Sequence, residues 1–291
     1  MLNHPAELAV HKFLNDVVVQ KATLSTEVIN TIVEDVRDAL HRQFSGTEDR
    51  SKFRLRMSNI GKPYCQLWFE KNQPEKKMSK PNAFIMNMMF GDIVEALFKG
   101  VLRGAKVDFK NSEKVQLDLP DGTAISGTYD LVTDGVDDIK SASDWSYRNK
   151  FVDYETLEKD DPFGYVDQLA GYGKASGEGA GGWWAVNKNN GNFKFIKANV
   201  DVDKRMEEFY VKKQKLDENI FERCFDAVPE TYRKKLTGNT VLNRACTFCD
   251  FRYTCWPTLK ERPATNYSGA KSAPLVSYVA MEGDADAEHN V

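Results

Sequence analysis

The chain has 291 residues, of which 41% are hydrophobic and 29% charged, enough apolar material for one large domain or two small ones. No apolar run reaches the roughly 18 residues that a membrane-spanning helix needs, so we expect a soluble protein with no membrane partner. The net charge of -3 lacks the basic excess of many nucleic-acid-binding domains, although carboxylates that hold metal ions would offset a basic groove in this sum.

The N-terminal sequence MLNHPAELAVHKFLND is charged and lacks the apolar stretch of a secretory signal. We therefore expect a cytoplasmic, reducing environment. Disulfides are rare there, and clustered cysteines are more often metal ligands or redox groups.

The first third of the chain is predicted to be mainly helical. Apolar residues recur at helical spacing over residues 5–44, which predicts one or two amphipathic helices. The same spacing predicts a helix over residues 82–102, with Gly104 as its stop. Between these helices, residues 46–80 are polar and basic around Cys65, and KNQPEKKMSKPN predicts a loop.

The period then changes to that of strands. KVQLDL, AISGTYDLV and VDDIKSAS are separated by the turn sequences PDG and TDG, which predicts a meander of three short strands. A helix is expected around residues 165–175. Two further strands, WWAVNK and FKFIKANV, are joined by an Asn-Gly turn, and a long charged helix is expected over residues 202–225.

This order of elements favours an α/β or α+β core with an added helical region. The phosphate-binding patterns GxGxxG and GxxxxGK[ST] do not occur, which argues against a dinucleotide-binding enzyme or an NTPase motor. We expect an N-terminal helical region over residues 1–57, a core domain over residues 58–262, and a disordered acidic tail over residues 263–291.

A group of charged residues lies on the predicted meander. Side chains alternate across a strand, so Asp138 and Lys140 share one face while Asp137 and Ile139 point to the other. An antiparallel hairpin would bring Asp130 beside Asp138. Two carboxylates on one face favour a hard cation such as Mg²⁺, and a lysine beside it can orient or deprotonate a water. Taken alone, the same pattern also fits solvated acidic residues beside a hairpin turn.

Four short motifs place these residues in a longer pattern. The segment Gly91 to Glu95 matches G-x-x-x-[H/E], and Gly127 to Asp130 matches G-x-x-D. Asp138 to Lys140 matches [D/E]-x-K, and Gln168 to Tyr172 matches Q-x-x-x-Y. In this order, over roughly residues 58 to 257, the chain resembles the RecB-like branch of the PD-(D/E)XK nuclease superfamily.

The resemblance implies a mixed central sheet flanked by helices and a metal-dependent DNA nuclease. The implied ligands of one or two Mg²⁺ or Mn²⁺ ions are Glu95, Asp130, Asp138 and the backbone carbonyl of Ile139. The implied catalytic partners are Lys140 at the attacking water, and Gln168 and Tyr172, which would position that water or the DNA strand.

The sequence departs from the family pattern at two positions, and two of the assigned roles have a simpler alternative. Many family members carry His in place of Glu95 and Glu in place of Asp138, which leaves metal preference open. Glu95 is also compatible with an exposed helix carboxylate, and Gln168 and Tyr172 are compatible with simple coverage of one helix face.

Cysteines form a second pattern. Cys246, Cys249 and Cys255 are spaced as C-x2-C-x5-C, and no histidine lies near them, so a fourth ligand must come from elsewhere. Thiolates ligate both zinc and iron-sulfur clusters. Cys224 lies in an apolar stretch that predicts a helix, and we interpret it as a buried, unpaired cysteine.

Iron-sulfur members of the RecB-like nucleases, including AddB and the CRISPR-associated adaptation nucleases, place one cysteine before the nuclease motifs and three after. The resemblance therefore implies a structural [4Fe-4S] clasp, with Zn²⁺ as the alternative. Its implied ligands are Cys65, Cys246, Cys249 and Cys255.

The expected function is that of a metal-dependent deoxyribonuclease, an exonuclease acting on single-stranded DNA or duplex ends in recombination, repair or end processing. The alternatives are a catalytically silent nucleic-acid-binding module and a zinc-stabilised structural protein. Because the chain carries no helicase motifs, it resembles a stand-alone nuclease of a kind often encoded by phages, which would act in the host cytoplasm. The resemblance also admits a homo-oligomer. Trp183 and Trp184 are interpreted as core residues rather than as platforms for stacking bases.

Overall fold

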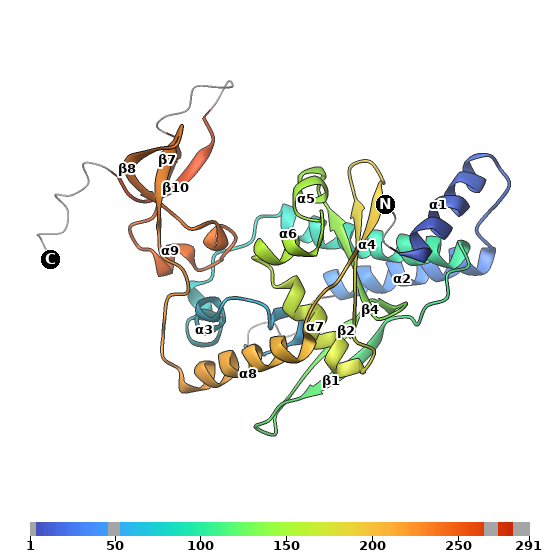
Figure 1. Cartoon of the computed structure of the whole chain (residues 1–291), viewed down its shortest axis with the longest axis horizontal. Coiled ribbons are helices and arrows are strands. Elements are labelled where there is room, and N and C mark those ends of the chain that lie inside the picture. Colours follow the sequence, from blue (N-terminus) through green and yellow to red (C-terminus); the bar gives the residue numbers. More distant parts are fainter. Residues whose placement is uncertain (1–3, 46–52, 265–272, 282–291) are drawn as a thin grey trace, which may run out of the picture. The chain divides into compact units, whose positions relative to one another are not determined.

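A computed structural model describes residues 4–45, 53–264 and 273–281 (Figure 1). The protein is a mixed α/β structure whose described strands form three separate sheets. It divides into two compact units: unit 1 comprises Met1–Gly61 and Lys80–Gln214, and unit 2 comprises Lys62–Ser79 and Lys215–Val291. This division differs from the three consecutive regions predicted from the sequence. Contacts group residues 62–79 with the C-terminal part of the chain instead of with the core.

Unit 1 contains most of the regular structure. Its helices and strands are α1 (Pro5–Val18), α2 (Thr26–Phe44), the 3-10 turn Met57–Asn59, α4 (Ala83–Gly104), β1 (Glu113–Asp118), β2 (Ala124–Tyr129), β3 (Leu131–Val132), β4 (Val136–Ala142), α5 (Asp144–Asn149), α6 (Tyr154–Lys159), α7 (Tyr165–Ser176), β5 (Ala180–Asn187), β6 (Phe193–Lys197) and α8 (Val202–Glu218), whose last turn lies in unit 2.

The predicted helices before the strands are confirmed. Helix α1 begins after His4, whose Nδ1 accepts a hydrogen bond from the Ala6 N–H at 3.1 Å. Helix α2 begins after Ser25, whose hydroxyl accepts from the Val28 N–H at 3.2 Å. Both side chains satisfy first-turn donors that have no partner inside the helix.

The main sheet has the strand order β3-β4-β5-β6 and lies between two layers of helices. Strands β4 and β5 are parallel, and the other neighbours are antiparallel. Trp183 of β5 packs in the core that contains α7, whereas Trp184 packs in the core that contains α1 and α4, where its ring lies 5.2 Å from that of Phe98. Both tryptophans are fully buried, which confirms their interpretation as core residues.

The predicted three-strand meander is wrong in one respect, because it divides between two sheets at Asp130. Strands β1 and β2 pair only with each other, whereas β3 pairs with β4 in the main sheet, with Leu131 opposite Asp137. Asp130 belongs to neither strand, and it reaches β4 through its side chain instead of its backbone. The polypeptide can therefore change sheets at this residue.

Unit 2 is built from two segments of the chain. Its elements are α3 (Tyr64–Asn72), the 3-10 turn Pro74–Lys76, β7 (Val228–Tyr232), β8 (Lys235–Val241), the 3-10 turn Arg244–Cys246, α9 (Arg252–Cys255), β9 (Lys260–Pro263) and β10 (Leu275–Ala280). The strands form an antiparallel sheet in the order β7-β8-β10-β9.

Two sequence predictions are corrected in this part of the chain. Residues 275–280 form β10 instead of belonging to a disordered tail, because Tyr278 is buried and its hydroxyl donates to Glu230 Oε1 at 2.9 Å. The rest of the predicted tail, residues 265–272 and 282–291, lies outside the described residues. The helix predicted to reach residue 225 ends at Glu218, because Asn219 adopts a left-handed conformation with φ of 61°.

None of the helices described here combines the length and the apolar character needed to cross a membrane.

Candidate active site and cysteine cluster

The predicted charged residues of the meander come together at β4. The backbone N–H of Ile139 donates to Asp130 Oδ2 at 2.7 Å, which brings the Asp130 carboxylate to the edge of the strand. Lys140 Nζ lies 2.6 Å from Asp138 Oδ2. Asp138 Oδ2 is buried, and the Lys140 ammonium group pairs with it.

The carboxylates of this group repel one another in a buried environment. Burial, followed by the charges of Glu95 and Asp138, raises the pKa of Asp130 well above its usual range. Burial likewise raises the pKa of Asp138. For Lys140, burial acts to lower the pKa, but the charges of Asp138, Tyr165 and Asp130 outweigh it and raise the pKa above its usual value. The group therefore stabilises positive charge.

Glu95 of α4 is connected to Asp130 through two neighbours. The buried Lys99, one helical turn after Glu95, donates to the Glu95 carboxylate and to Ser112 Oγ, the latter at 2.6 Å. The Ser112 hydroxyl in turn donates to the backbone carbonyl of Asp130 at 3.0 Å. Glu95 is thus part of the same polar network and is not an isolated surface carboxylate. Sequence reasoning missed Lys99, although a lysine inside the apolar run EALFKGV was a signal.

Helix α7 presents aromatic and amide groups to the same cluster. Tyr172 is buried, and burial raises its pKa to about 12, while its hydroxyl shares a hydrogen bond with Gln168. Its electrostatic interactions with Asp138, Asp130 and Lys140 place it beside the carboxylates. Tyr172 therefore interacts with the carboxylates, and Gln168 interacts with Tyr172.

Two further residues at the site were missed by the sequence analysis. The ring of Tyr165, the first residue of α7, lies 4.6 Å from Lys140 Nζ and 4.5 Å from Lys150 Nζ. Lys150 is buried, and burial lowers its pKa. Lys150 also lies 3.8 Å from Asp161, which accepts a hydrogen bond from the backbone of α7. The short loop before α7 is thereby tied to the site.

The donor atoms of this group fit a hard divalent cation. Within the described ranges, no three His, Cys, Asp or Glu side chains are arranged to hold a metal ion as they stand. The chemistry nevertheless matches Mg²⁺ or Mn²⁺, because three carboxylates interact electrostatically and carboxylate oxygens are the ligands that these ions prefer. The residues that fit these ions are Glu95, Asp130, Asp138 and the backbone carbonyl of Ile139.

All five cysteines of the chain lie in unit 2, and none forms a disulfide. Burial, followed by the thiols of Cys249, Cys255 and Cys224, raises the pKa of Cys246 to about 12. Cys65, in the first turn of α3, interacts with Cys224 and with Cys249. An all-sulfur donor set of this kind fits either an iron-sulfur cluster or zinc.

The interpretation of Cys224 as a buried helical residue is wrong. Its segment is irregular because α8 ends at Glu218, and the residue is exposed. Its sulfur accepts a hydrogen bond from the backbone N–H of Cys65 at 3.0 Å. The sequence offered no periodic signal for this contact, since the two residues are 159 positions apart.

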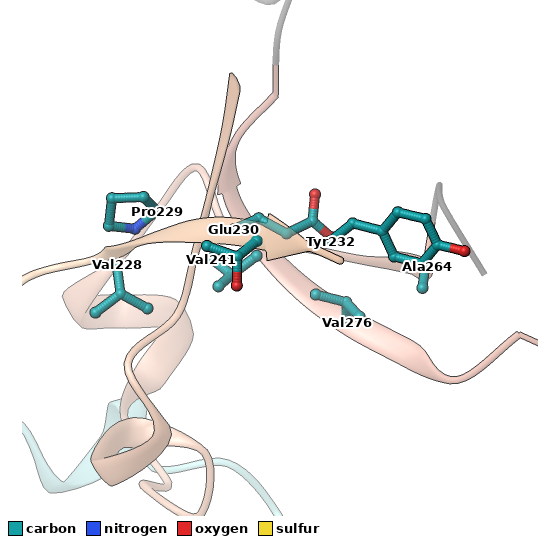
Figure 2. A pocket seen from close by; sticks show the side chains of 8 residues that line it. Val228, Pro229, Glu230, Tyr232, Val241, Ala264 and Val276 are labelled. Atoms are coloured by element: carbon teal, nitrogen blue, oxygen red, sulfur yellow. The ribbon is translucent and has the colours of Figure 1, made fainter. Parts of the chain in front are cut away.

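Unit 2 also contains a shallow pocket on its sheet, between β7, β8 and β10. Figure 2 shows Val228, Pro229, Val241 and Val276 along it, with the carboxyl group of Glu230 nearby. That carboxylate accepts hydrogen bonds from the side chains of three residues, Thr237 and Asn239, both at 2.7 Å, and Tyr278. The Glu230 carboxylate is thus hydrogen-bonded within the sheet, and most of the other residues that line the pocket are apolar.

Comparisons with known proteins place few constraints on this chain. No protein-family model matches it, and neither does any curated protein sequence. A solved structure entitled "Crystal structure of SSO0001" is similar to it with a TM-score of 0.44 and 13% sequence identity. The match covers 76% of this chain and 94% of that one. Similarity this low supports no argument about fold or function.

Proposed function

We propose that the protein is a Mg²⁺- or Mn²⁺-dependent deoxyribonuclease of the RecB-like PD-(D/E)XK type. The observation that carries this proposal is the meeting of Asp130, Asp138 and Lys140 at β4, within electrostatic reach of Glu95. Glu95 comes from α4, Asp130 from the junction of β2 and β3, and Asp138 and Lys140 from β4. The four motifs that contain or adjoin them occur in the order of that superfamily.

The chain's own residues have distinct parts in the proposed hydrolysis. Glu95, Asp130, Asp138 and the Ile139 carbonyl would hold the divalent ion, which supplies charge that polarises the phosphate and acidifies a bound water. Lys140, which pairs with Asp138, would hold the attacking water and offset negative charge in the transition state.

The residues of α7 complete the proposed geometry. The hydrogen bond between Gln168 and Tyr172 fixes both side chains, which would orient the water or the scissile phosphate. Because the transition state gains charge on phosphate oxygens, hydrogen-bond donors fixed in advance lower the barrier without having to reorganise.

The substrate in this proposal is DNA, cleaved from single-stranded or duplex ends during recombination, repair or end processing. A [4Fe-4S] cluster held by Cys65, Cys246, Cys249 and Cys255 would serve as a structural clasp, with Zn²⁺ as the alternative at the same thiols. The support is the gathering of these cysteines in unit 2 without disulfides. Such a centre would contribute folding free energy instead of a catalytic group.

The test is digestion of end-labelled single- and double-stranded DNA in the presence of Mg²⁺, Mn²⁺ or EDTA. We expect cleavage with either ion, none with EDTA, and at most about a hundredth of the wild-type rate in Asp130→Ala or Lys140→Ala. Asp134→Asn is the matched control, because Asp134 lies on the same hairpin but is 84% exposed. Cleavage retained by both alanine variants would overturn the site, and DNA binding without cleavage by the wild type would favour the silent binding module.

Purified protein that contains zinc and takes up no iron and sulfide would favour zinc at the thiols.

A further inference from the structure

The start of α3 lacks the usual side-chain cap. Its N-cap residue is Pro63, which has no side-chain acceptor, so the first-turn N–H groups need partners from elsewhere. The Cys65 N–H finds one in the sulfur of Cys224, at 3.0 Å.

Separate contacts hold the segment around Cys224 in place. Arg223 Nη2 donates to the Cys255 carbonyl at 2.8 Å, and its guanidinium lies 3.9 Å from the ring centroid of Trp256. On the other side, the Tyr64 hydroxyl donates to the Ile220 carbonyl. The chain before Cys224 is therefore fixed both to α3 and to the C-terminal end of α9.

The position of Cys224 links the upstream cysteine to the downstream ones. Its sulfur contacts Cys65, and it also interacts electrostatically with Cys246, which in turn interacts with Cys249 and Cys255. Contact in one case and electrostatic interaction in the others therefore link the five cysteines. A cubane cluster or a tetrahedral zinc site bound only by thiolates uses four of them.

We propose that Cys224 is a sulfur ligand of the metal centre in unit 2, sharing with Cys65 the position that Cys246, Cys249 and Cys255 leave open. This inference rests on the metal centre of the proposed function but not on nuclease activity. It assigns a ligand role to a cysteine outside the one-plus-three pattern, on the basis of its contacts with Cys65 and, through Arg223, with Cys255.

The test is anaerobic reconstitution of the full-length protein with ferrous iron and sulfide, in the wild type and in four variants. The variants are Cys224→Ser, Cys65→Ser, the double variant of these two, and Cys246→Ser. The readouts are iron and acid-labile sulfide per chain, the visible absorption band, and the electron paramagnetic resonance spectrum of the reduced cluster. Far-UV circular dichroism monitors folding. If the purified protein contains zinc, the same variants are compared by zinc content and by the thiolate-to-metal charge-transfer band of Co²⁺.

We expect each single variant at Cys65 or Cys224 to retain a cluster and the double variant to fall to the iron content of Cys246→Ser. We also expect Cys224→Ser to alter the electron paramagnetic resonance spectrum, because oxygen would replace sulfur on iron in part of the population. A purely structural role of Cys224 would not produce this change. This single-variant spectrum decides the matter even if the double variant does not fold. An unchanged spectrum in Cys224→Ser, together with a double variant that binds as much iron as Cys65→Ser, would overturn the inference. Full iron in Cys246→Ser would instead overturn the metal centre itself.

Discussion

The backbone N–H of Ile139 donates a hydrogen bond to Asp130 Oδ2 at 2.7 Å, across the point where the chain passes from one sheet to the other. A carboxylate here replaces a backbone carbonyl as the partner of a strand N–H. The same side chain is the most strongly repelled acid of the site, because burial, Glu95 and Asp138 all oppose its charge. Asp130 therefore serves both the fold and the proposed ion.

These two roles are separable with Asp130→Asn, because the amide oxygen can still accept from Ile139. We expect this variant to fold and to be at least as stable as the wild type without divalent ions, since it removes a buried charge that its neighbours disfavour. In Mg²⁺ at about 100 times its Kd, the wild type should gain about 2.7 kcal/mol, and the variant much less. Thermal unfolding followed with and without Mg²⁺ measures both effects. An equal gain in the two proteins would exclude Asp130 as a ligand.

Lys140→Ala should reduce Mg²⁺-dependent DNA cleavage by about 10²- to 10⁴-fold, the range associated with a positioned proton-transfer group. The reason is the loss of the cation beside Asp138, while the carboxylates that hold the ion remain. Lys110→Ala is the control, because Lys110 is exposed and its ion pair with Glu178 is a surface pair of little energetic value. Initial rates on end-labelled DNA give the comparison. Equal rates in the two variants would contradict the role of Lys140.

Lys99→Met should lower the Mg²⁺ concentration required for half-maximal cleavage. The Lys99 ammonium pairs with Glu95 and thus competes with a divalent ion for that carboxylate. Removing it should also lower stability in EDTA, because Glu95 would then lack its partner near two other acids. Lys99→Arg keeps the charge and should resemble the wild type. A Mg²⁺ titration of activity that is identical for Lys99→Met and the wild type would show that Lys99 and the ion do not compete.

Gly61 and Gly164 touch through their backbones, and a Cβ on Gly164 would lie 2.3 Å from Gly61. Gly164 also has φ of 71°, where L residues are strained. Gly164→Ala should therefore cost more than the roughly 1–3 kcal/mol of backbone strain alone. Gly122→Ala is a matched control, since Gly122 has φ of 81° and open space around its would-be Cβ. The difference in free energy of unfolding between the two variants reports the contact; a difference of zero would refute it.

His4 gives the protein a defined dependence on pH. Burial, only partly offset by Asp134, lowers the pKa of His4 below its usual value of 6.5. Since the folded protein binds this proton less well than the unfolded chain, the stabilising contribution is present above pH 6.5 and is lost as the pH falls through the lowered pKa. His4→Asn keeps a cap acceptor for α1 but does not titrate. Chemical unfolding between pH 7 and pH 5 should show a smaller loss of stability in the variant, and parallel curves would contradict this.

Local patterns were sufficient for the elements that carry the site. Alternation along β4 correctly separates Asp138 and Lys140 from Ile139, and helical spacing gives α4 and α7. The short helices α5 and α6 were missed because six residues are too few for a period to be visible. Their capping residues were nevertheless present, since Ser143 and Asp153 each accept from an N–H three residues later.

The remaining errors come from interactions between distant segments. The sequence LVSYVA resembles a strand, but its surroundings are rich in small and polar residues, and only pairing with β8 and β9 fixes it as β10. Cys224 was assigned to a helix because its neighbours are apolar, whereas Phe221 in fact packs against Phe69 of α3. Apolar residues around a loop and around a helix look alike until the partner is known.

The discontinuity of unit 2 imposes an order on synthesis. Helix α3 leaves the ribosome long before residues 215–281, so its buried side chains Leu67 and Phe69 have no partners from unit 2 while unit 1 is being made. Cys65 must likewise wait until Cys224 has been made before any other thiol arrives. Any metal that requires these cysteines together can therefore be inserted only after Cys255 has been made. Its supply would then act after the segments of unit 1 have been synthesised.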